Sequence, residues 1–175
     1  IVNLQSGISE PYLNIQVNIN LSLSLNQAGY PTENITIKSS PIITDLNGDL
    51  FSEIYFGADD GNFYGFGADG NPLNGFPFNV GADVRSSPAV GDVDGDGDNE
   101  IVFGSSNGRL SILNNDGSEN SIYQISGLIS GSPALYDLDD DGDLEIVFTS
   151  DYNSSGKVYA IHHNGEDFEN FPVDI

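Results

Sequence analysis

The clearest periodic pattern lies near the start of the chain, where apolar and polar residues alternate from Tyr12 to Leu25. Alternation with a period of two over this length is typical of a long strand with one buried face. We expect either an ordinary sheet strand or an edge strand that pairs with another domain or subunit. The apolar positions are Leu13, Ile15, Val17, Ile19, Leu21, Leu23 and Leu25.

From Ser39 onward the chain repeats itself. Three short runs are apolar at both parities, and a strand of this kind needs cover on both faces. We expect that cover from neighbouring sheets stacked on either side. The runs are Ile54–Phe56, Ile101–Phe103 and Ile146–Phe148, and each follows a Ser-Pro pair that ends at Pro41, Pro88 or Pro133.

Turns divide each repeat into four short strands. Pairs such as Asn107-Gly108 and Asp116-Gly117 favour tight hairpins, because the preferred turns need positive φ. Four antiparallel strands in about 46 residues have the size of a propeller blade. The predicted fold is therefore all-β, with β-propeller-type blades in an incomplete propeller. It comprises three repeats, at residues 39–85, 86–130 and 131–175, and N-terminal β-strands in residues 1–38 that end a preceding blade or link to one.

Each repeat also holds an acidic window of nine residues. In residues 92–100, five carboxylates occupy alternate positions around Gly97. Carboxylates this close repel one another by roughly 1 kcal/mol per pair even in water, and calcium is a cation that takes several hard oxygen ligands. Acids that serve only solubility would scatter, whereas these recur in register at residues 45–53 and 137–145. The spacing predicts calcium sites in the second and third windows. A weaker site is expected in the first, where Leu50 replaces the glycine and Asn47 removes a charge.

Composition narrows the class of partner. A net charge of −23 with only four basic residues disfavours binding to nucleic acid or to anionic membranes. Cysteine is absent, which excludes disulfides and thiolate metal sites, and no apolar run reaches the about 18 residues that a membrane span needs. Because the sequence starts at Ile1 and contains no methionine, we expect a processed or excised piece of a longer precursor.

Residues 39–175 resemble the FG-GAP family, the integrin-α-type β-propeller repeat, and its bacterial VCBS-like relatives. The resemblance is carried by Ser-Pro, then Asp-x-Asp-x-Asp-Gly-x-x-Asp/Glu, then an apolar strand ending in Phe-Gly, although Thr149 follows Phe148 in the third repeat. In that family the loop binds calcium through side chains at positions one, three, five and nine and the carbonyl at seven. The resemblance therefore implies three ligand sets: Asp45, Asn47, Asp49 and Glu53 with the Phe51 carbonyl; Asp92, Asp94, Asp96 and Glu100 with the Asp98 carbonyl; and Asp137, Asp139, Asp141 and Glu145 with the Asp143 carbonyl.

Two other calcium loops fit less well. An EF-hand or dockerin loop needs an acid at position twelve, but Phe56, Phe103 and Phe148 occupy that position. Thrombospondin type 3 repeats normally contain cysteines. Family propellers usually have about seven blades, so we expect a fragment, a small fourth sheet from the N-terminal strands, or closure by other subunits.

No catalytic constellation stands out. The sequence has no Gly-x-Ser-x-Gly elbow, phosphate-binding glycine loop or Cys/His pair. His162 and His163 are neighbours on an expected strand, so they would point to opposite faces and could not jointly hold a metal. We expect exposed or edge histidines, and a chain that is not an enzyme.

These patterns predict a Ca²⁺-binding extracellular or cell-surface repeat module for adhesion, with an unidentified protein or glycan as its partner. Extracellular modules of this kind bind calcium at about 0.1–1 mM. Two alternatives remain open. The chain could be a structural subunit that self-associates through its N-terminal strand, or the non-catalytic propeller of a secreted enzyme.

Overall fold

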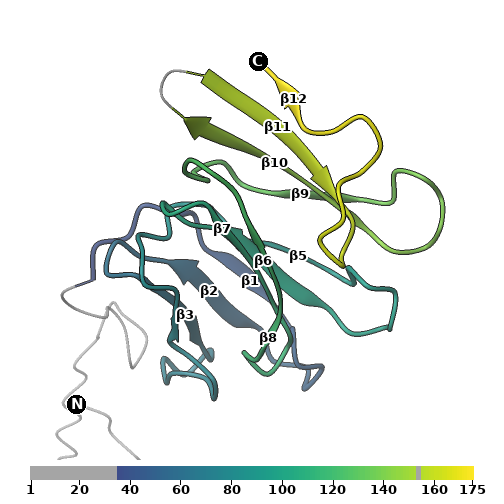
Figure 1. Ribbon diagram of the computed structural model, residues 1–175. Helices are drawn as coiled ribbons and strands as arrows, with labels where there is room; N and C mark the ends of the chain where they lie inside the picture. The colour runs from purple at the N-terminus through teal and green to yellow at the C-terminus, as the bar shows by residue number, and fades with distance from the viewer. Residues whose placement is uncertain (1–34, 153–154) are drawn as a thin grey trace, which may run out of the picture.

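The computed structural model describes residues 35–152 and 155–175, and the regular structure of these residues consists of β-strands (Figure 1). Twelve strands form three four-stranded sheets, and every pairing is antiparallel. The strands are β1 (Ile42–Thr44), β2 (Glu53–Gly57), β3 (Asn62–Phe66) and β4 (Phe78–Asn79) in the first sheet; β5 (Ala89–Gly91), β6 (Glu100–Gly104), β7 (Arg109–Leu113) and β8 (Glu119–Gln124) in the second; and β9 (Ala134–Tyr136), β10 (Glu145–Tyr152), β11 (Ser155–Ile161) and β12 (Val173–Asp174) in the third.

The predicted all-β fold of four-stranded units is confirmed, and the order of strands in each sheet follows the chain. Each sheet lies within one of the ranges 39–85, 86–130 and 131–175. The alternating segment from Tyr12 to Leu25 lies outside the described residues. Of the N-terminal range, residues 35–38 are described, and they carry no strand. None of the described residues belongs to a helix long and apolar enough to cross a membrane.

The second sheet is packed between the other two, as Figure 1 shows. All five residues of β6 are buried, and successive side chains of a strand point to opposite faces. Ile101 and Phe103 join the core shared with the first sheet, while Val102 joins the core shared with the third. This two-sided burial explains why the run Ile101–Phe103 is apolar at both parities.

Aromatic side chains connect neighbouring sheets. The rings of Phe63 on β3 and Phe103 on β6 stack with centroids 4.0 Å apart. Tyr123 on β8 packs edge-on against Phe148 on β10, with centroids 6.1 Å apart. The Tyr123 hydroxyl also donates a hydrogen bond to Asp167, at 2.6 Å. Stacked and edge-to-face pairs of this kind add about 0.5–1.5 kcal/mol beyond the area that they bury, so the sheets form a continuous stack.

The Phe-Gly element has a packing function. A Cβ on Gly57 would lie 2.3 Å from Val84 Cγ1, and a Cβ on Gly104 would lie 2.1 Å from Ile129 Cγ2. Val84 and Ile129 belong to the segments that connect one sheet to the next. Glycine at the end of the second strand therefore lets the connecting segment lie directly against the sheet.

Candidate metal centres

The acidic windows form the loops between the first and second strands of the three sheets, and the glutamate at position nine begins the second strand. Positions four and six of each loop have positive φ. The angles are 73° at Gly48, 73° at Gly95, 62° at Asp140, 73° at Leu50, 97° at Gly97 and 102° at Gly142. Left-handed backbone turns each loop inward. The sequence pattern identified the bend at position six but not the one at position four.

The glutamate at position nine is buried in every loop, with an exposed fraction of 2% for Glu53, 2% for Glu100 and 0% for Glu145. One oxygen of each carboxylate accepts a hydrogen bond from the backbone N–H of position two. The distances are 3.0 Å from Leu46 to Glu53, 3.0 Å from Val93 to Glu100 and 2.6 Å from Leu138 to Glu145. A buried carboxylate is costly unless its charge is compensated, and of the three second oxygens that of Glu145 is buried without a hydrogen-bond partner.

The second loop gathers Asp92, Asp94 and Asp96, each offering a carboxylate oxygen within 4.8 Å of the others. Oδ2 of Asp92 accepts a hydrogen bond from the Gly97 N–H at 3.0 Å. By contrast, Oδ1 of Asp92 and Oδ1 of Asp94 are buried without a hydrogen-bond donor. A hard cation satisfies such oxygens, so this donor set fits calcium.

Glu100 lies beside this group but is not a member of it. Burial, together with the charges of Asp94, Asp96 and Asp92, raises the pKa of Glu100 to about 7. The side chain of Asp98 is exposed, and the prediction for this residue concerns its backbone carbonyl alone. The second loop thus concentrates uncompensated negative charge that a cation would neutralise.

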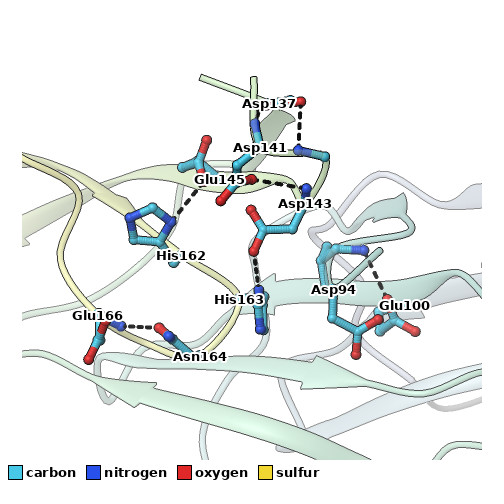
Figure 2. Close-up of polar contacts among 12 residues, drawn as sticks. Asp94, Glu100, Asp137, Asp141, Asp143, Glu145, His162, His163, Asn164 and Glu166 are labelled. Carbon is cyan, nitrogen blue, oxygen red and sulfur yellow. Dashed lines mark hydrogen bonds and ion pairs between the residues drawn. The ribbon is translucent and has the colours of Figure 1, made fainter. Parts of the chain in front are cut away.

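The third loop gathers its carboxylates in a similar way (Figure 2). Asp137, Asp139 and Asp141 form one close group, and Asp141, Asp143 and Glu145 form a second. Oδ1 of Asp143 and Oε1 of Glu145 are buried without a hydrogen-bond donor. Burial and the adjacent Asp141 raise the pKa of Asp143, and the hydrogen bonds to Asp143 lower the pKa of Asp141. These oxygens also fit a hard cation.

The first loop satisfies its own carboxylates. Asp45, Asp49 and Glu53 form a close group, but Asp45 Oδ1 accepts hydrogen bonds from the N–H groups of Gly48 and Asp49, at 2.9 and 3.1 Å. Asp45 Oδ2 accepts another from Leu50 at 2.9 Å. Asn47 Oδ1 accepts a hydrogen bond from the Asp49 N–H. The Phe51 side chain is exposed. Within the described part of the chain, the donorless buried oxygens all belong to the second and third loops.

The prediction that His162 and His163 lie on a strand was wrong. Strand β11 ends at Ile161, so His162 and His163 lie beyond the strand and do not alternate between its faces. Both rings point to the third loop, as Figure 2 shows: His162 Nδ1 lies 2.9 Å from Glu145 Oε1, and His163 Nδ1 contacts Asp143 Oδ2. The sequence pattern did not locate the end of the strand at Ile161. Without that boundary, the direction of the two rings could not be predicted.

Comparisons with known proteins agree with this architecture. A sequence model described as an FG-GAP-like repeat matches residues 92–148, which include the second and third acidic loops. Among solved structures, the V. cholerae biofilm matrix protein Bap1 is similar over 79% of this chain, with 25% sequence identity and a TM-score of 0.52. The chain covers 31% of the Bap1 chain, so it spans about a third of that protein's length.

A complex of BBS1N with ARL6DN also matches, with 16% identity, coverage of 85% of this chain and 55% of that chain, and a TM-score of 0.47. A search of curated proteins finds no match. The chain therefore carries an FG-GAP-like repeat, at residues 92–148, within an all-β fold of propeller-like four-stranded sheets.

Proposed function

We propose that these sheets form a calcium-dependent repeat module of an extracellular or cell-surface protein. The observation that carries the proposal is the set of four buried carboxylate oxygens without a hydrogen-bond donor. They are Asp92 Oδ1, Asp94 Oδ1, Asp143 Oδ1 and Glu145 Oε1. Leaving a buried charged acceptor unpaired costs more than about 1–3 kcal/mol, so a loop that keeps several of them is built for a cation.

The residues that would hold calcium are those at positions one, three, five and nine of the second and third loops. A bound divalent ion would neutralise the repulsion among these carboxylates and fix the loop between two strands. The protein's own contribution is the left-handed backbone at positions four and six, which turns the side chains inward, and the N–H of position two, which orients the glutamate. The first loop, whose carboxylates are already bonded to its backbone, would bind calcium more weakly.

An extracellular location is supported by the affinity expected for such sites. Extracellular calcium modules work at about 0.1–1 mM, a concentration that exported proteins meet. FG-GAP-like repeats are typical of extracellular proteins, and the net charge of −23 would be partly neutralised by bound cations.

An adhesive or matrix role is the proposed purpose of the module, with a protein or glycan as partner. The support is the structural likeness to Bap1, a biofilm matrix protein of V. cholerae. We also propose that the module does not catalyse a reaction itself, because its clustered carboxylates serve as cation ligands. Self-association through the segment from Tyr12 to Leu25 stays a proposal that light scattering in calcium would test.

Isothermal titration calorimetry with calcium, paired with thermal melts in calcium and in excess chelator, tests the proposal. We expect saturable binding and a clear fall in melting temperature after chelation, because a ligand that binds only the native state stabilises it by about 2.7 kcal/mol at a hundredfold excess over Kd. A melting temperature that is identical in calcium and in chelator would exclude calcium-dependent stability.

A further inference from the structure

The third loop contains a nitrogen donor beside its carboxylates. Asp139, Glu145 and His162 each offer one ligand atom, and these atoms all lie within 4.8 Å of one another. His162 follows the last residue of β11, and its ring lies beside the carboxylate of Glu145, as Figure 2 shows. A cation bound between these atoms would therefore have one imidazole and two carboxylates as ligands.

The nitrogen donor is specific to the third sheet. In every sheet, the residue after the glutamate at position nine pairs with the last residue of the third strand: Ile54 with Phe66, Ile101 with Leu113, and Ile146 with Ile161. The next residue along the chain is Gly67 in the first sheet, Asn114 in the second and His162 in the third. At this equivalent position the first sheet therefore has no side chain, the second has an amide and the third has an imidazole.

The contacts of Asn114 show that the second loop is arranged differently. Its Oδ1 accepts a hydrogen bond from Asn120 Nδ2 at 2.9 Å, and Asn120 also reaches Asp94 Oδ2 at 3.4 Å. The second loop therefore has two neutral amides, Asn114 and Asn120, where the third loop has an imidazole. Hard oxygen ligands alone suit calcium.

Glu145 provides a second, independent sign of a cation at the third loop. Its side chain is fully buried, and its Oε2 accepts the Leu138 N–H. Its Oε1 receives no hydrogen bond, although His162 Nδ1 lies 2.9 Å away. An imidazole nitrogen and a buried carboxylate oxygen that lie 2.9 Å apart with no hydrogen bond to the oxygen are placed to bind one shared cation.

We infer that the third loop, besides calcium, takes a divalent transition metal of the zinc class through Asp139, Glu145 and His162, whereas the second loop takes calcium alone. Imidazole suits zinc, nickel and copper, and carboxylates and water suit calcium. A zinc site with one histidine, two carboxylates and a water would have the usual four ligands. The inference deepens the proposed function, since it takes the third loop as a cation site and assigns the class of cation.

Calorimetric titrations of the untagged protein with zinc chloride alone and with calcium chloride alone test this assignment. The variant His162→Asn copies the arrangement of the second loop, and His162→Gln is an independent second variant. We expect each to weaken zinc binding at least about tenfold, as loss of a group that holds or orients a metal does, while calcium binding at the second loop is unchanged. The reciprocal variant Asn114→His should add a zinc site, which would appear as a higher zinc stoichiometry.

Several outcomes would overturn the inference. The inference is excluded if the wild type does not bind zinc, or if both His162 variants bind zinc as tightly as the wild type. It is also excluded if zinc binding is lost only in His163→Asn. Failure of the proposed function looks different, because calcium would then bind neither loop even if zinc binding still required His162. Circular dichroism of each variant separates loss of a ligand from loss of the fold, and a misfolded His162→Asn would leave His162→Gln and Asn114→His to decide.

Discussion

Glu100 is almost fully buried, and its Oε2 accepts a hydrogen bond from the backbone N–H of Val93 at 3.0 Å. Val93 itself is only 1% exposed, so the N–H has no access to water. The same bond recurs from Leu46 to Glu53 and from Leu138 to Glu145. The glutamate at position nine therefore closes the loop structurally, in addition to the ligand role that the spacing predicts for it.

Replacing Glu100 separates these two roles. Glu100→Ala leaves the Val93 N–H buried and unpaired, which we expect to cost about 1–3 kcal/mol. Glu100→Gln keeps an acceptor for that N–H and removes a buried charge. In chelator at pH 8, the Glu100→Gln variant should therefore be more stable than the wild type, and the Glu100→Ala variant should be the least stable of the three. In calcium the wild type should be the most stable. Urea titrations measure the order, and an unchanged order in both buffers would contradict the dual role.

The second loop should contribute more calcium-dependent stability than the first. Asp94 Oδ1 is a buried oxygen without a donor, while Asp49 Oδ1 is bonded to the Phe51 N–H at 2.9 Å. In millimolar calcium, Asp94→Ala should lower the melting temperature more than Asp49→Ala. In chelator the order should reverse, because Asp49→Ala still loses the hydrogen bond from the Phe51 N–H, whereas Asp94→Ala removes a charge that lacks its cation. Equal losses in calcium would show that the two loops bind alike.

Leu50 is a candidate for stabilisation. Its φ is +73°, a conformation that costs an L-residue other than glycine roughly 1–2 kcal/mol, and its side chain is 90% exposed. Leu50→Gly relieves this strain and loses no buried contact, but glycine increases the entropy of the unfolded chain. We expect a net gain of about 0.5–1 kcal/mol in denaturant unfolding. Leu138, which is 43% exposed in the third loop and lacks positive φ, is the control: Leu138→Gly should not stabilise.

Gly104→Ala tests the contact between a sheet and its connecting segment. The added Cβ would lie 2.1 Å from Ile129 Cγ2 and 2.5 Å from its Cβ. Overpacking of this kind costs about 1–3 kcal/mol. The double variant Gly104→Ala/Ile129→Gly should lose less than the sum of the single variants, since glycine at position 129 has neither of the two clashing atoms. If the losses of unfolding free energy in urea are additive, the destabilisation by Gly104→Ala does not come from its contact with Ile129.

The pH dependence of one exposed ion pair can be predicted from its geometry. Hydrogen bonds from Arg85 Nε and Lys38 Nζ, at 2.7 and 2.9 Å, lower the pKa of Asp59 below its usual value. A lowered folded-state pKa contributes stability that is present above the unfolded value of about 4 and is lost as the pH falls through the folded one. Asp59→Asn should therefore be slightly less stable than wild type at pH 6, and the difference should disappear near pH 2. Paired thermal melts across this range check the direction, and a difference that grew on acidification would refute it.

The repeat, the four-stranded unit and the place of each acidic loop could be predicted from the sequence, because these features depend on local patterns. Alternation, turn glycines and the spacing of carboxylates act over a few residues, and runs apolar at both parities already require sheets on both sides. The sequence also identified Leu50 as a departure, which the structure locates at a position of positive φ.

The packed fold was needed to show which carboxylate oxygens lack a hydrogen-bond donor. It was also needed to show that Asp45 accepts hydrogen bonds from backbone N–H groups of the first loop. The structure also brought His162 to Glu145. This contact depends on where β11 ends and on its pairing with β10, so it joins residues that are distant along the chain. The physical reason is that hydrogen-bond satisfaction and side-chain direction are properties of packed strands in register, which the local pattern of residues does not specify.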